Sequence, residues 1–294
     1  MEAKKVVITG GLGHVGSHLV RTLGMIHSDL LQITILDDLS TQRYCSLIGL
    51  PQNTKFVESD YSKCASIIDD ADVIIHLAAH NEALKSLSNV EEYYQNNVHR
   101  LKKLVNQVVT DSQIFIFPST TSIYGSNEND IAPQSVYAQT KIEGERIVST
   151  LPNHYILRLG TIFGPSRGMR FHTAINKFCL QAYLGQKLTI WKEYLDFTRA
   201  YLGLRDLSDT ILEILKGTIP VGTYNLVSEN KKLSDIINYI REIKLDVKVD
   251  LIDSPLKDQK SYEVSCDHIK KYVKISETLR NGIFRTMDYL EDNR

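Results

Sequence analysis

The 294-residue sequence has little of several residue types that would indicate a special environment. It has four cysteines, and their scattered positions match neither a disulfide framework nor the spacing of metal ligands. We therefore expect free thiols in a reducing compartment and no bound metal. No hydrophobic run approaches the length of a membrane span, and the first five residues lead directly into a hydrophobic β-type segment without room for a signal peptide. These absences predict a cytoplasmic protein.

An excess of charge of one sign is also missing. Lys and Arg together number 34 and Asp and Glu number 35, which gives a formal net charge of −1. This balance gives no reason to expect a nucleic acid, a membrane or an acidic protein as partner. The sequence has no internal repeat and no low-complexity segment. A chain of this length can form one large domain or two smaller ones, so its domain organisation must be inferred from its motifs.

A glycine-rich turn is the most informative motif. Gly10, Gly13 and Gly16 stand between a hydrophobic β-type segment, Val6–Ile8, and a helical hydrophobic pattern that starts near Val15. Such a turn lets the backbone approach a pyrophosphate, and the N-terminus of the following helix offers free N–H groups. The alternative is an ordinary strand-to-helix turn that needs glycine for packing. Because a strand precedes the glycines and a helix follows them, we interpret the turn as a dinucleotide site.

An acidic residue gives the second sign of a dinucleotide. Asp37 follows a predicted strand, Ile33–Leu36, where a carboxylate accepts hydrogen bonds from both ribose hydroxyls of the adenosine and repels a 2′-phosphate. The first Lys or Arg after it is Arg43, which we expect to lie too far along the chain to bind that phosphate. The sequence therefore favours NAD over NADP. Asp37 could instead be a plain loop acid, and Asp38 beside it leaves the assignment open.

The first half of the chain alternates between strand-like and helix-like segments. The strands are hydrophobic throughout, as expected when helices cover both faces of a sheet. Alternating units of this kind predict a Rossmann-type, doubly wound parallel sheet in an α/β fold. The predicted strands are Val6–Ile8, Ile33–Leu36, Lys55–Val57, Val73–His76, Ile114–Phe117 and Tyr155–Leu157, with helices over about Val90–Thr110 and Val136–Ser149.

After Pro165 the pattern loosens and has no glycine turn of its own. We expect residues 1–165 to form the NAD-binding domain. Residues 166–294 are expected to form mainly a smaller α/β substrate-binding cap, with some segments returning to the core sheet. We predict helices at Phe171–Leu184, Leu207–Leu215, Ile236–Ile240 (with Ser234 as N-cap) and about Ser276–Leu290, and strands at Leu188–Ile190, Tyr224–Leu226 and Val247–Leu251.

Tyr137 and Lys141 are the residues that best fit a catalytic role. A spacing of four places a phenol and an ammonium on one face of a helix, and a nearby cation lowers the pKa of a tyrosine. Such a phenol can exchange a proton with a sugar hydroxyl or carbonyl. The stretch Ser119–Gly125 leaves the C-terminal end of the fifth predicted strand and supplies hydroxyls that can share this proton. The alternatives are an exposed helical pair and a loop whose hydroxyls bind its own backbone.

These motifs together resemble the extended short-chain dehydrogenase/reductase family, in its NAD-dependent nucleotide-sugar epimerase/dehydratase branch. The resemblance runs nearly end to end. It is carried by Thr9–Gly16, Asp37–Thr41, Asp60, His76–Ala79, Tyr93–Val98, Pro133–Tyr137 and Leu157–Pro165.

The resemblance implies a set of functional residues and a homodimer. Thr120, Tyr137 and Lys141 become the catalytic residues, with the tyrosine as acid and base and the lysine orienting NAD. The dimer is expected to form through the helices around Val90–Thr110 and Val136–Ser149. Besides Tyr137 and Lys141, the implied cofactor-binding residues are Gly10, Gly13, His14, Val15, Asp37, Asp60, Tyr61, Leu77, Ala78, Ala79 and Asn97. The implied substrate-binding residues are Thr121, Tyr124, Thr161, Arg170, His172 and Arg199.

Departures from the family pattern narrow the expected reaction. In 4,6-dehydratases an Asp and a Glu follow the catalytic threonine, whereas here Thr121 and Ser122 follow it. Neither hydroxyl can act as an acid or base for elimination near pH 7, so dehydration is not expected. A lysine usual in galactose-type epimerases maps to Asn81, with Lys85 one helical turn later. The Asp that follows the family's diphosphate-binding arginine is replaced by Ala200, next to Arg199.

The sequence thus predicts an NAD-dependent nucleotide-sugar epimerase that acts at C4 through a keto intermediate. A dehydrogenase or reductase of the same family is the alternative, because the sequence does not show whether the keto sugar is reduced again or released. A non-catalytic, NAD-binding regulatory protein is the alternative from another class. The intact Thr120, Tyr137 and Lys141 count against it.

Overall fold

The computed structural model describes residues 3–26, 28–108, 111–253 and 261–292. Its main feature is a seven-stranded sheet in the order β10-β6-β5-β4-β1-β2-β3, with every neighbouring pair parallel. This order contains the Rossmann order 3-2-1-4-5-6 and confirms the predicted doubly wound α/β fold. The strands are β1 (Lys4–Thr9), β2 (Leu31–Asp37), β3 (Thr54–Glu58), β4 (Val73–His76), β5 (Ile114–Thr120), β6 (His154–Leu159) and β10 (Gly222–Leu226).

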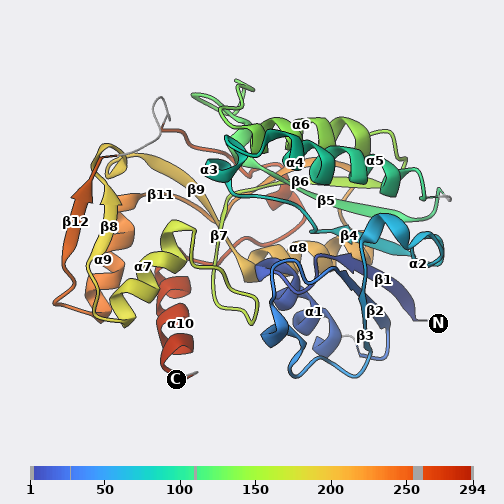
Figure 1. The fold of residues 1–294 in the computed structure, drawn as a ribbon, viewed down its shortest axis with the longest axis horizontal. Coiled ribbons are helices and arrows are strands. Elements are labelled where there is room, and N and C mark those ends of the chain that lie inside the picture. Colours follow the sequence, from blue (N-terminus) through green and yellow to red (C-terminus); the bar gives the residue numbers. More distant parts are fainter. Residues whose placement is uncertain (1–2, 27, 109–110, 254–260, 293–294) are drawn as a thin grey trace.

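Helices cover both faces of this sheet (Figure 1). Residues Val6 and Ile8 of β1 pack on one face with Leu19, whereas Val7 between them packs on the other face with Leu101. Both faces are buried, which explains why the strands are hydrophobic at successive positions. One face carries α1 (His14–Ile26) and α8 (Leu204–Lys216); the other carries α2 (Ala65–Asp69), α4 (Val90–Tyr94), α5 (Arg100–Val105) and α6 (Val136–Val148).

Short helical turns surround the carboxyl ends of the strands. The helix predicted over Val90–Thr110 is interrupted by a π-helical turn, η3 (Gln95–His99), while residues 109–110 lie outside the described part of the chain. A π turn adds a residue to the helical repeat and is common at functional sites. The other short elements of this region are η1 (Tyr44–Leu47), η2 (Tyr61–Lys63), α3 (Ala83–Ser86) and η4 (Thr121–Ile123).

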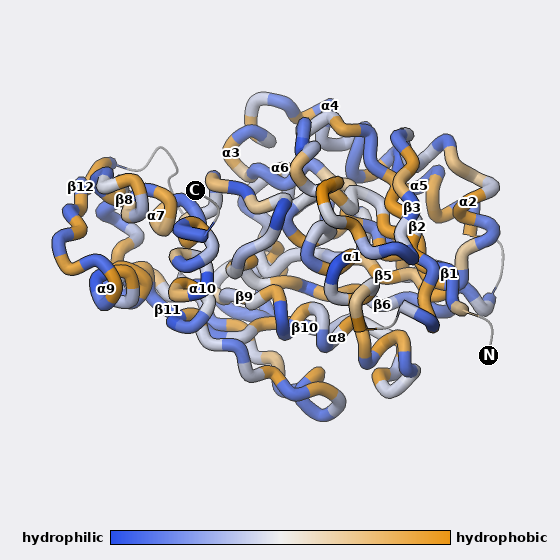
Figure 2. The backbone as a smooth tube through the Cα atoms, turned by 90° about the horizontal axis from the view of Figure 1, so that it is seen from below, coloured by the Kyte–Doolittle hydropathy of each residue, from blue (hydrophilic) through white to orange (hydrophobic). Residues whose placement is uncertain are grey.

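The second half of the chain builds a smaller unit with its own core, in which Phe178, Ile236 and Ile283 pack together. The elements of this part, which we call the small unit, are α7 (Ala174–Tyr183), β8 (Leu188–Trp191), η5 (Lys192–Tyr194), α9 (Leu233–Ile243), β12 (Val249–Ile252) and α10 (Leu279–Asp292). Figure 2 shows the small unit at the end of the molecule opposite to β1, β2 and β3.

A three-stranded sheet, β11-β9-β7, joins the small unit to the main sheet. Its strands are β7 (Thr161–Phe163), β9 (Thr198–Gly203) and β11 (Glu229–Lys232), and η6 (Ile269–Lys271) follows later in the chain. The structure corrects the predicted start of α9: Lys232 is its N-cap residue, and the N–H of Lys232 donates to Asp235. Ser234 lies inside the helix, and its N–H donates to the carbonyl of Leu195.

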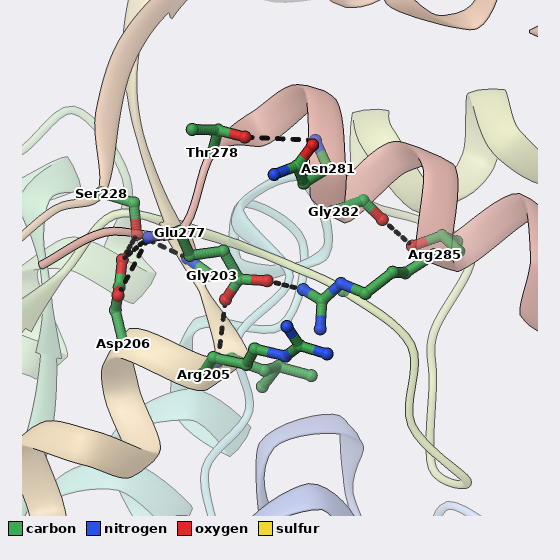
Figure 3. Close-up of polar contacts among 12 residues, drawn as sticks. Gly203, Arg205, Asp206, Ser228, Glu277, Thr278, Asn281, Gly282 and Arg285 are labelled. Carbon is green, nitrogen blue, oxygen red and sulfur yellow. Dashed lines mark hydrogen bonds and ion pairs between the residues drawn. The ribbon is translucent and has the colours of Figure 1, made fainter.

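Buried charges connect α8 below the sheet with α10 of the small unit (Figure 3). The Asp206 carboxylate accepts hydrogen bonds from Ser228 and from the N–H groups of Ser276 and Glu277. The Glu277 carboxylate accepts the N–H of Arg205 and forms an ion pair with Arg285 on α10. Both carboxylates are buried and paired, so this cluster fixes how α10 sits against α8.

Candidate active site

A cleft of about 580 Å³ opens at the carboxyl ends of the central strands. This is the edge at which parallel α/β sheets bind ligands. The glycine turn after β1 and the loops after β2, β4 and β5 line it, together with α6 and the segment that follows β7. Of the predicted site residues, those that line the cleft are Gly10, Gly13, His14, Val15, Asp37, Asp60, Tyr61, Leu77, Ala78, Ala79, Thr120, Thr121, Tyr137, Lys141, Thr161, Arg170 and His172.

The glycine turn fits a dinucleotide. Gly10 has a φ of +66°, and a Cβ on it would lie 2.7 Å from the backbone nitrogen of Ala78. A Cβ on Gly16 would lie 2.5 Å from the Cα of Gly11, which explains why glycine stands where α1 packs against the turn. Gly13, His14 and Val15 leave backbone exposed to the cleft at the N-terminus of α1. This arrangement suits a diphosphate.

Asp37 stands at the end of β2 with both carboxylate oxygens engaged by backbone. It accepts the N–H of Leu12 at 3.1 Å and that of Leu39 at 3.0 Å. Burial raises the pKa of its carboxyl. Each oxygen keeps a free lone pair for a ribose hydroxyl.

Arg43 also lines the cleft and is close enough to Asp37 for their charges to interact, and its guanidinium donates to the carbonyls of Gly168 and Met169. That it does not bind a 2′-phosphate stays a prediction. The chain folds back here because Leu39 and Gln42 adopt left-handed backbone conformations, with φ of 56° and 53°.

Thr120 and Tyr137 meet inside the cleft. Thr120 is the last residue of β5, and Tyr137 lies in the first turn of α6, where the Ser135 side chain caps the helix. Burial raises the pKa of Tyr137 to about 12, and the hydrogen bond with the Thr120 side chain and the charge of Arg170 oppose that rise. Two hydroxyls that line the same cleft are suited to hold a substrate oxygen and exchange its proton.

Lys141 lies on the same face of α6 as Tyr137 but points to the end of β5. Its ammonium donates to the Pro118 carbonyl at 2.7 Å and lies 4.6 Å from the centre of the Phe117 ring. Burial lowers the pKa of Lys141 to about 8. Arg170 is the cation whose charge lowers the pKa of Tyr137 in this structure, and the lowering that the spacing assigns to Lys141 stays a prediction.

Arg170 and His172 bring positive charge to the rim of the cleft. The Arg170 guanidinium donates to the Asn81 side chain, so it lies next to the position at which the resemblance led us to expect a lysine. Burial, followed by the charge of Arg170, lowers the pKa of His172 to about 4. His172 is therefore neutral near pH 7, and Arg170 is the charged member of the two.

Three predicted site residues do not line the cleft. Asn97, in η3, holds the loop after β4: its side chain accepts the N–H of His80 at 2.9 Å, donates to the His80 carbonyl at 2.8 Å and donates to Thr140 at 3.1 Å. Tyr124 is buried below the cleft and contacts Arg158. Arg199 lies between the rings of Phe197 and Tyr262, and burial lowers its pKa.

One segment lies over the glycine turn in a contact that the sequence did not predict. We call residues 164–170 the strap. His14 Nε2 donates to the Gly164 carbonyl at 2.8 Å, the Ser166 hydroxyl donates to the His14 carbonyl at 2.9 Å, and the N–H of Gly168 donates to Ser17 at 2.8 Å. Arg43 donates to the carbonyls of Gly168 and Met169. The only sequence signal for this contact is the small residue Gly168 in a polar loop.

Two features are absent from the described residues. Within residues 3–26, 28–108, 111–253 and 261–292, no group of three or more His, Cys, Asp or Glu side chains is placed to hold a metal ion. In the same part of the chain, no helix has the length and hydrophobicity required to cross a membrane.

Curated proteins that resemble this chain include dehydratases. A trifunctional UDP-glucose 4,6-dehydratase/UDP-4-keto-6-deoxy-D-glucose 3,5-epimerase/UDP-4-keto-L-rhamnose-reductase from Arabidopsis thaliana is 26% identical over 99% of this chain, which spans only 48% of that protein. The chain thus has about half the length of the first plant relatives it matches. A dTDP-D-glucose 4,6-dehydratase from Bos taurus is 24% identical and covers 99% of this chain and 90% of that protein. These relatives give no support to the expectation that dehydration is unlikely.

Comparison of structures and of family patterns identifies the family. UDP-glucuronic acid 4-epimerase from Bacillus cereus, solved with UDP-glucuronic acid and NAD, has a TM-score of 0.88 at 22% identity and covers 99% of this chain and 100% of that one. At this identity the likeness establishes the fold. The sequence model of the NAD dependent epimerase/dehydratase family matches residues 6–226, three quarters of the chain. The chain therefore belongs to the NAD-dependent epimerase/dehydratase family, as its motifs indicated, and its cofactor is NAD.

Proposed function

We propose that this protein is an NAD-dependent nucleotide-sugar epimerase that inverts a sugar carbon, C4 in the first instance, through a keto intermediate. The observation that carries the proposal is that Thr120 and Tyr137 line the cleft together, where Thr120 opposes the rise in the pKa of the phenol and Lys141 is fixed at the same end of β5. A phenol held by a hydroxyl, close to cationic side chains, is suited to move a proton to and from a substrate oxygen. A regulatory protein that only binds NAD has no need of this arrangement.

In the proposed reaction Tyr137 takes the proton of the sugar hydroxyl while the Thr120 hydroxyl holds the same oxygen. NAD, when bound, supplies the acceptor for the hydride and its return to the sugar. Burial raises the pKa of Tyr137 to about 12, so ionisation near pH 7 needs positive charge close to the phenol. Arg170 and Lys141 are the cations that we propose for this role. Lys141 is also the residue that we propose to orient the nicotinamide ribose.

The two halves of the chain have different binding roles in this proposal. Residues 1–165 hold the cofactor, and residues 166–294 mainly hold the substrate. Thr121, Thr161 and His172 line the cleft beside the catalytic pair and are proposed to contact the sugar. Arg170 is proposed to bind the substrate diphosphate, because its guanidinium lies in the cleft whereas Arg199 is packed between aromatic rings. Arginine suits this task because its planar fork matches phosphate oxygens.

The side chains next to Thr120 support epimerisation over dehydration. Elimination of water needs one group to protonate the leaving hydroxyl and another to take a proton from carbon. Thr121 and Ser122 line the cleft at these positions, and their hydroxyls do not titrate near neutral pH. A dehydrogenase or reductase would use the same catalytic pair and differs only in releasing the oxidised or reduced sugar. Reaction products must therefore distinguish these reactions.

The test is to incubate the protein with UDP-, GDP-, dTDP- and CDP-sugars and to record product mass, sugar composition and NADH absorbance. We expect a new sugar of unchanged mass without net NADH. A loss of two hydrogens with net NADH would identify a dehydrogenase instead, and a loss of one water would overturn the argument from Thr121 and Ser122. Tyr137→Phe is the matched control, because it keeps the ring but cannot move the proton.

A further inference from the structure

A buried group of polar side chains lies directly below the catalytic pair. Glu145 stands on α6 one turn after Lys141, and only 12% of its side chain is exposed. Its Oε1 accepts the Ser119 hydroxyl at 2.5 Å and the Nε of Arg158 at 3.0 Å. Its Oε2 accepts Nη2 of Arg158 at 2.7 Å. The carboxylate is therefore engaged by β5 and β6, and Glu145 itself does not line the cleft, whereas its partner Ser119 does.

Two side chains of α6 hold the end of β5 by bonding to two consecutive residues of that strand. Lys141 donates to the carbonyl of Pro118, and Glu145 accepts from Ser119, the next residue. Thr120 follows immediately and carries the hydroxyl that bonds to Tyr137. Tyr137 lies in the first turn of the same helix, so Glu145 and Lys141 tie the helix that carries Tyr137 to the end of the strand that carries Thr120.

Arg158 of β6 extends this support to the other end of η4. Its Nη1 donates to the Tyr124 hydroxyl at 2.9 Å, and Tyr124 in turn donates to Asn225 at 2.6 Å. Tyr124 is the residue that follows η4, just as Thr120 precedes it. The pair of Glu145 and Arg158 therefore holds both ends of the turn that presents Thr120, Thr121 and Ser122 to the cleft.

We infer that Glu145 is a positioning residue for the proposed reaction: it sets Thr120 against Tyr137 through Ser119 and supplies the negative charge that faces the buried Lys141 ammonium. The inference rests on the proposed function, since it assigns Glu145 a task in the chemistry of that site. Glu145 touches neither substrate nor cofactor in this role and acts through Ser119 and Lys141.

The charges around Lys141 explain why this carboxylate matters. Burial lowers the pKa of Lys141 to about 8, and Glu145 opposes that effect. His76 on β4 also faces Lys141 but is neutral, because burial lowers its pKa to about 3. Tyr137 shares the same helix and is protonated at rest. Arg158 on β6 lies beyond Glu145 and is balanced by it.

Without the Glu145 charge, Arg158 is left as an unbalanced buried cation and Lys141 loses the anion that it faces. Both changes favour the neutral form of Lys141. An uncharged Lys141 gives no electrostatic support to the Tyr137 phenolate. Glu145→Gln is therefore expected to lower the pKa of Lys141 by about one unit or more.

The experiment follows Lys141 directly in protein labelled with ¹³C-lysine, so that it does not depend on turnover. The Cε signal that titrates near pH 8 in the wild type and is missing in Lys141→Arg belongs to Lys141. We expect its midpoint to move down by about one pH unit in Glu145→Gln. Glu143→Gln is the matched control, because Glu143 lies on the same helix, has a side chain that is 41% exposed and pairs with Arg146. An unchanged midpoint in Glu145→Gln overturns the electrostatic part of the inference.

Turnover on the nucleotide sugar identified above tests the positioning part. In Glu145→Gln the alkaline limb of kcat should move to lower pH by the same amount, with KM nearly unchanged. Ser119→Ala and Glu145→Asp keep the charge but break or lengthen the bond to Ser119. We expect kcat about tenfold lower with the alkaline limb in place. Wild-type kcat in both variants would refute the positioning role. If Glu145→Gln does not fold, Ser119→Ala and Glu145→Asp still test this role. A wild type that turns over no nucleotide sugar would contradict the proposed function while leaving the Lys141 titration to decide on Glu145.

Discussion

At the scale of single residues, the proposed chemistry depends most on the Tyr137 hydroxyl. Tyr137→Phe removes the proton-transferring group and keeps the buried ring in place. General acid–base catalysis contributes about 10²–10⁴-fold, so we expect turnover to fall by that factor. NAD binding, measured by calorimetric titration, should stay within about twofold of the wild type, because one hydrogen bond at most is lost to the cofactor. Near-normal turnover in this variant would show that another group moves the proton.

The sequence predicts single residues well where their role follows from a local pattern. Gly10, Asp37, Thr120 and Tyr137 stand at the ends of strands or in the first turn of a helix, and all of them line the cleft. In a parallel sheet the carboxyl ends of all strands lie at the same edge, so a position at the end of a strand is enough to predict that a residue lies near the cleft.

The place of Arg43 in the cleft could not be predicted in this way, because it depends on a long connection. Arg43 donates to the carbonyls of Gly168 and Met169 in the strap, 125 and 126 residues later in the sequence. Tyr124 follows η4, and its hydroxyl is bonded to Arg158 of β6, so that Tyr124 does not line the cleft. Sequence spacing alone contains no information on which way a residue faces after such a turn.

At the scale of secondary-structure elements, the strap decides how the glycine turn is covered. It follows β7 and is joined to the glycine turn and α1 by His14, Ser17 and Ser166. β7, β9 and β11 were not predicted, because short strands with polar positions lack the hydrophobic run that marks a buried strand. The π turn in η3 was missed for a related reason: one added residue changes the helical repeat without a sequence signal.

The close contact between Gly168 of the strap and the glycine turn predicts an effect on NAD binding. A Cβ on Gly168 would lie 2.3 Å from the Leu12 carbonyl oxygen and 2.6 Å from that of Gly13. Gly168→Ala must therefore push the strap away from the glycine turn, since carbonyl oxygens of the backbone cannot move aside easily. We expect NAD to bind at least about tenfold more weakly, which corresponds to about 1.4 kcal/mol.

The control for this experiment is Arg167→Ala, which changes an exposed side chain of the same strap and keeps its backbone contacts. Its affinity for NAD should match the wild type, and the circular dichroism spectra of both variants should be unchanged. Equal affinity in Gly168→Ala would mean that the strap does not shape the cofactor site.

At the scale of the whole molecule, the buried charges and histidines connect the two halves of the chain. His14 lies between the glycine turn and the strap, and His18 on α1 faces Arg205 and Arg285 of the cluster that joins α8 to α10. Burial lowers the pKa of both histidines to about 4, and the two arginines add to the effect at His18. Burial also lowers the pKa of His76, in the centre of the sheet, to about 3.

These three histidines make the stability of the fold depend on pH. Each is neutral when folded but takes up a proton below about pH 6.5 when the chain unfolds. The unfolded state thus binds more protons between about pH 6.5 and 4, so the free energy of unfolding falls as pH falls through this window. Each histidine contributes a slope of about 1.4 kcal/mol per pH unit there. Urea denaturation at pH 7.5, 6.0, 5.0 and 4.5 measures this loss.

His18→Gln separates one contribution from the rest, because the amide keeps a polar group on α1 and does not titrate. Its free energy of unfolding should be less steep in pH by about 1.4 kcal/mol per unit between pH 6 and 4.5. The exposed His99→Gln variant serves as the control and should keep the wild-type slope. If His18→Gln also keeps that slope, His18 is protonated in the folded protein. The cluster at α10 would then have to hold three neighbouring cations, Arg205, Arg285 and His18, against the Glu277 and Asp206 carboxylates.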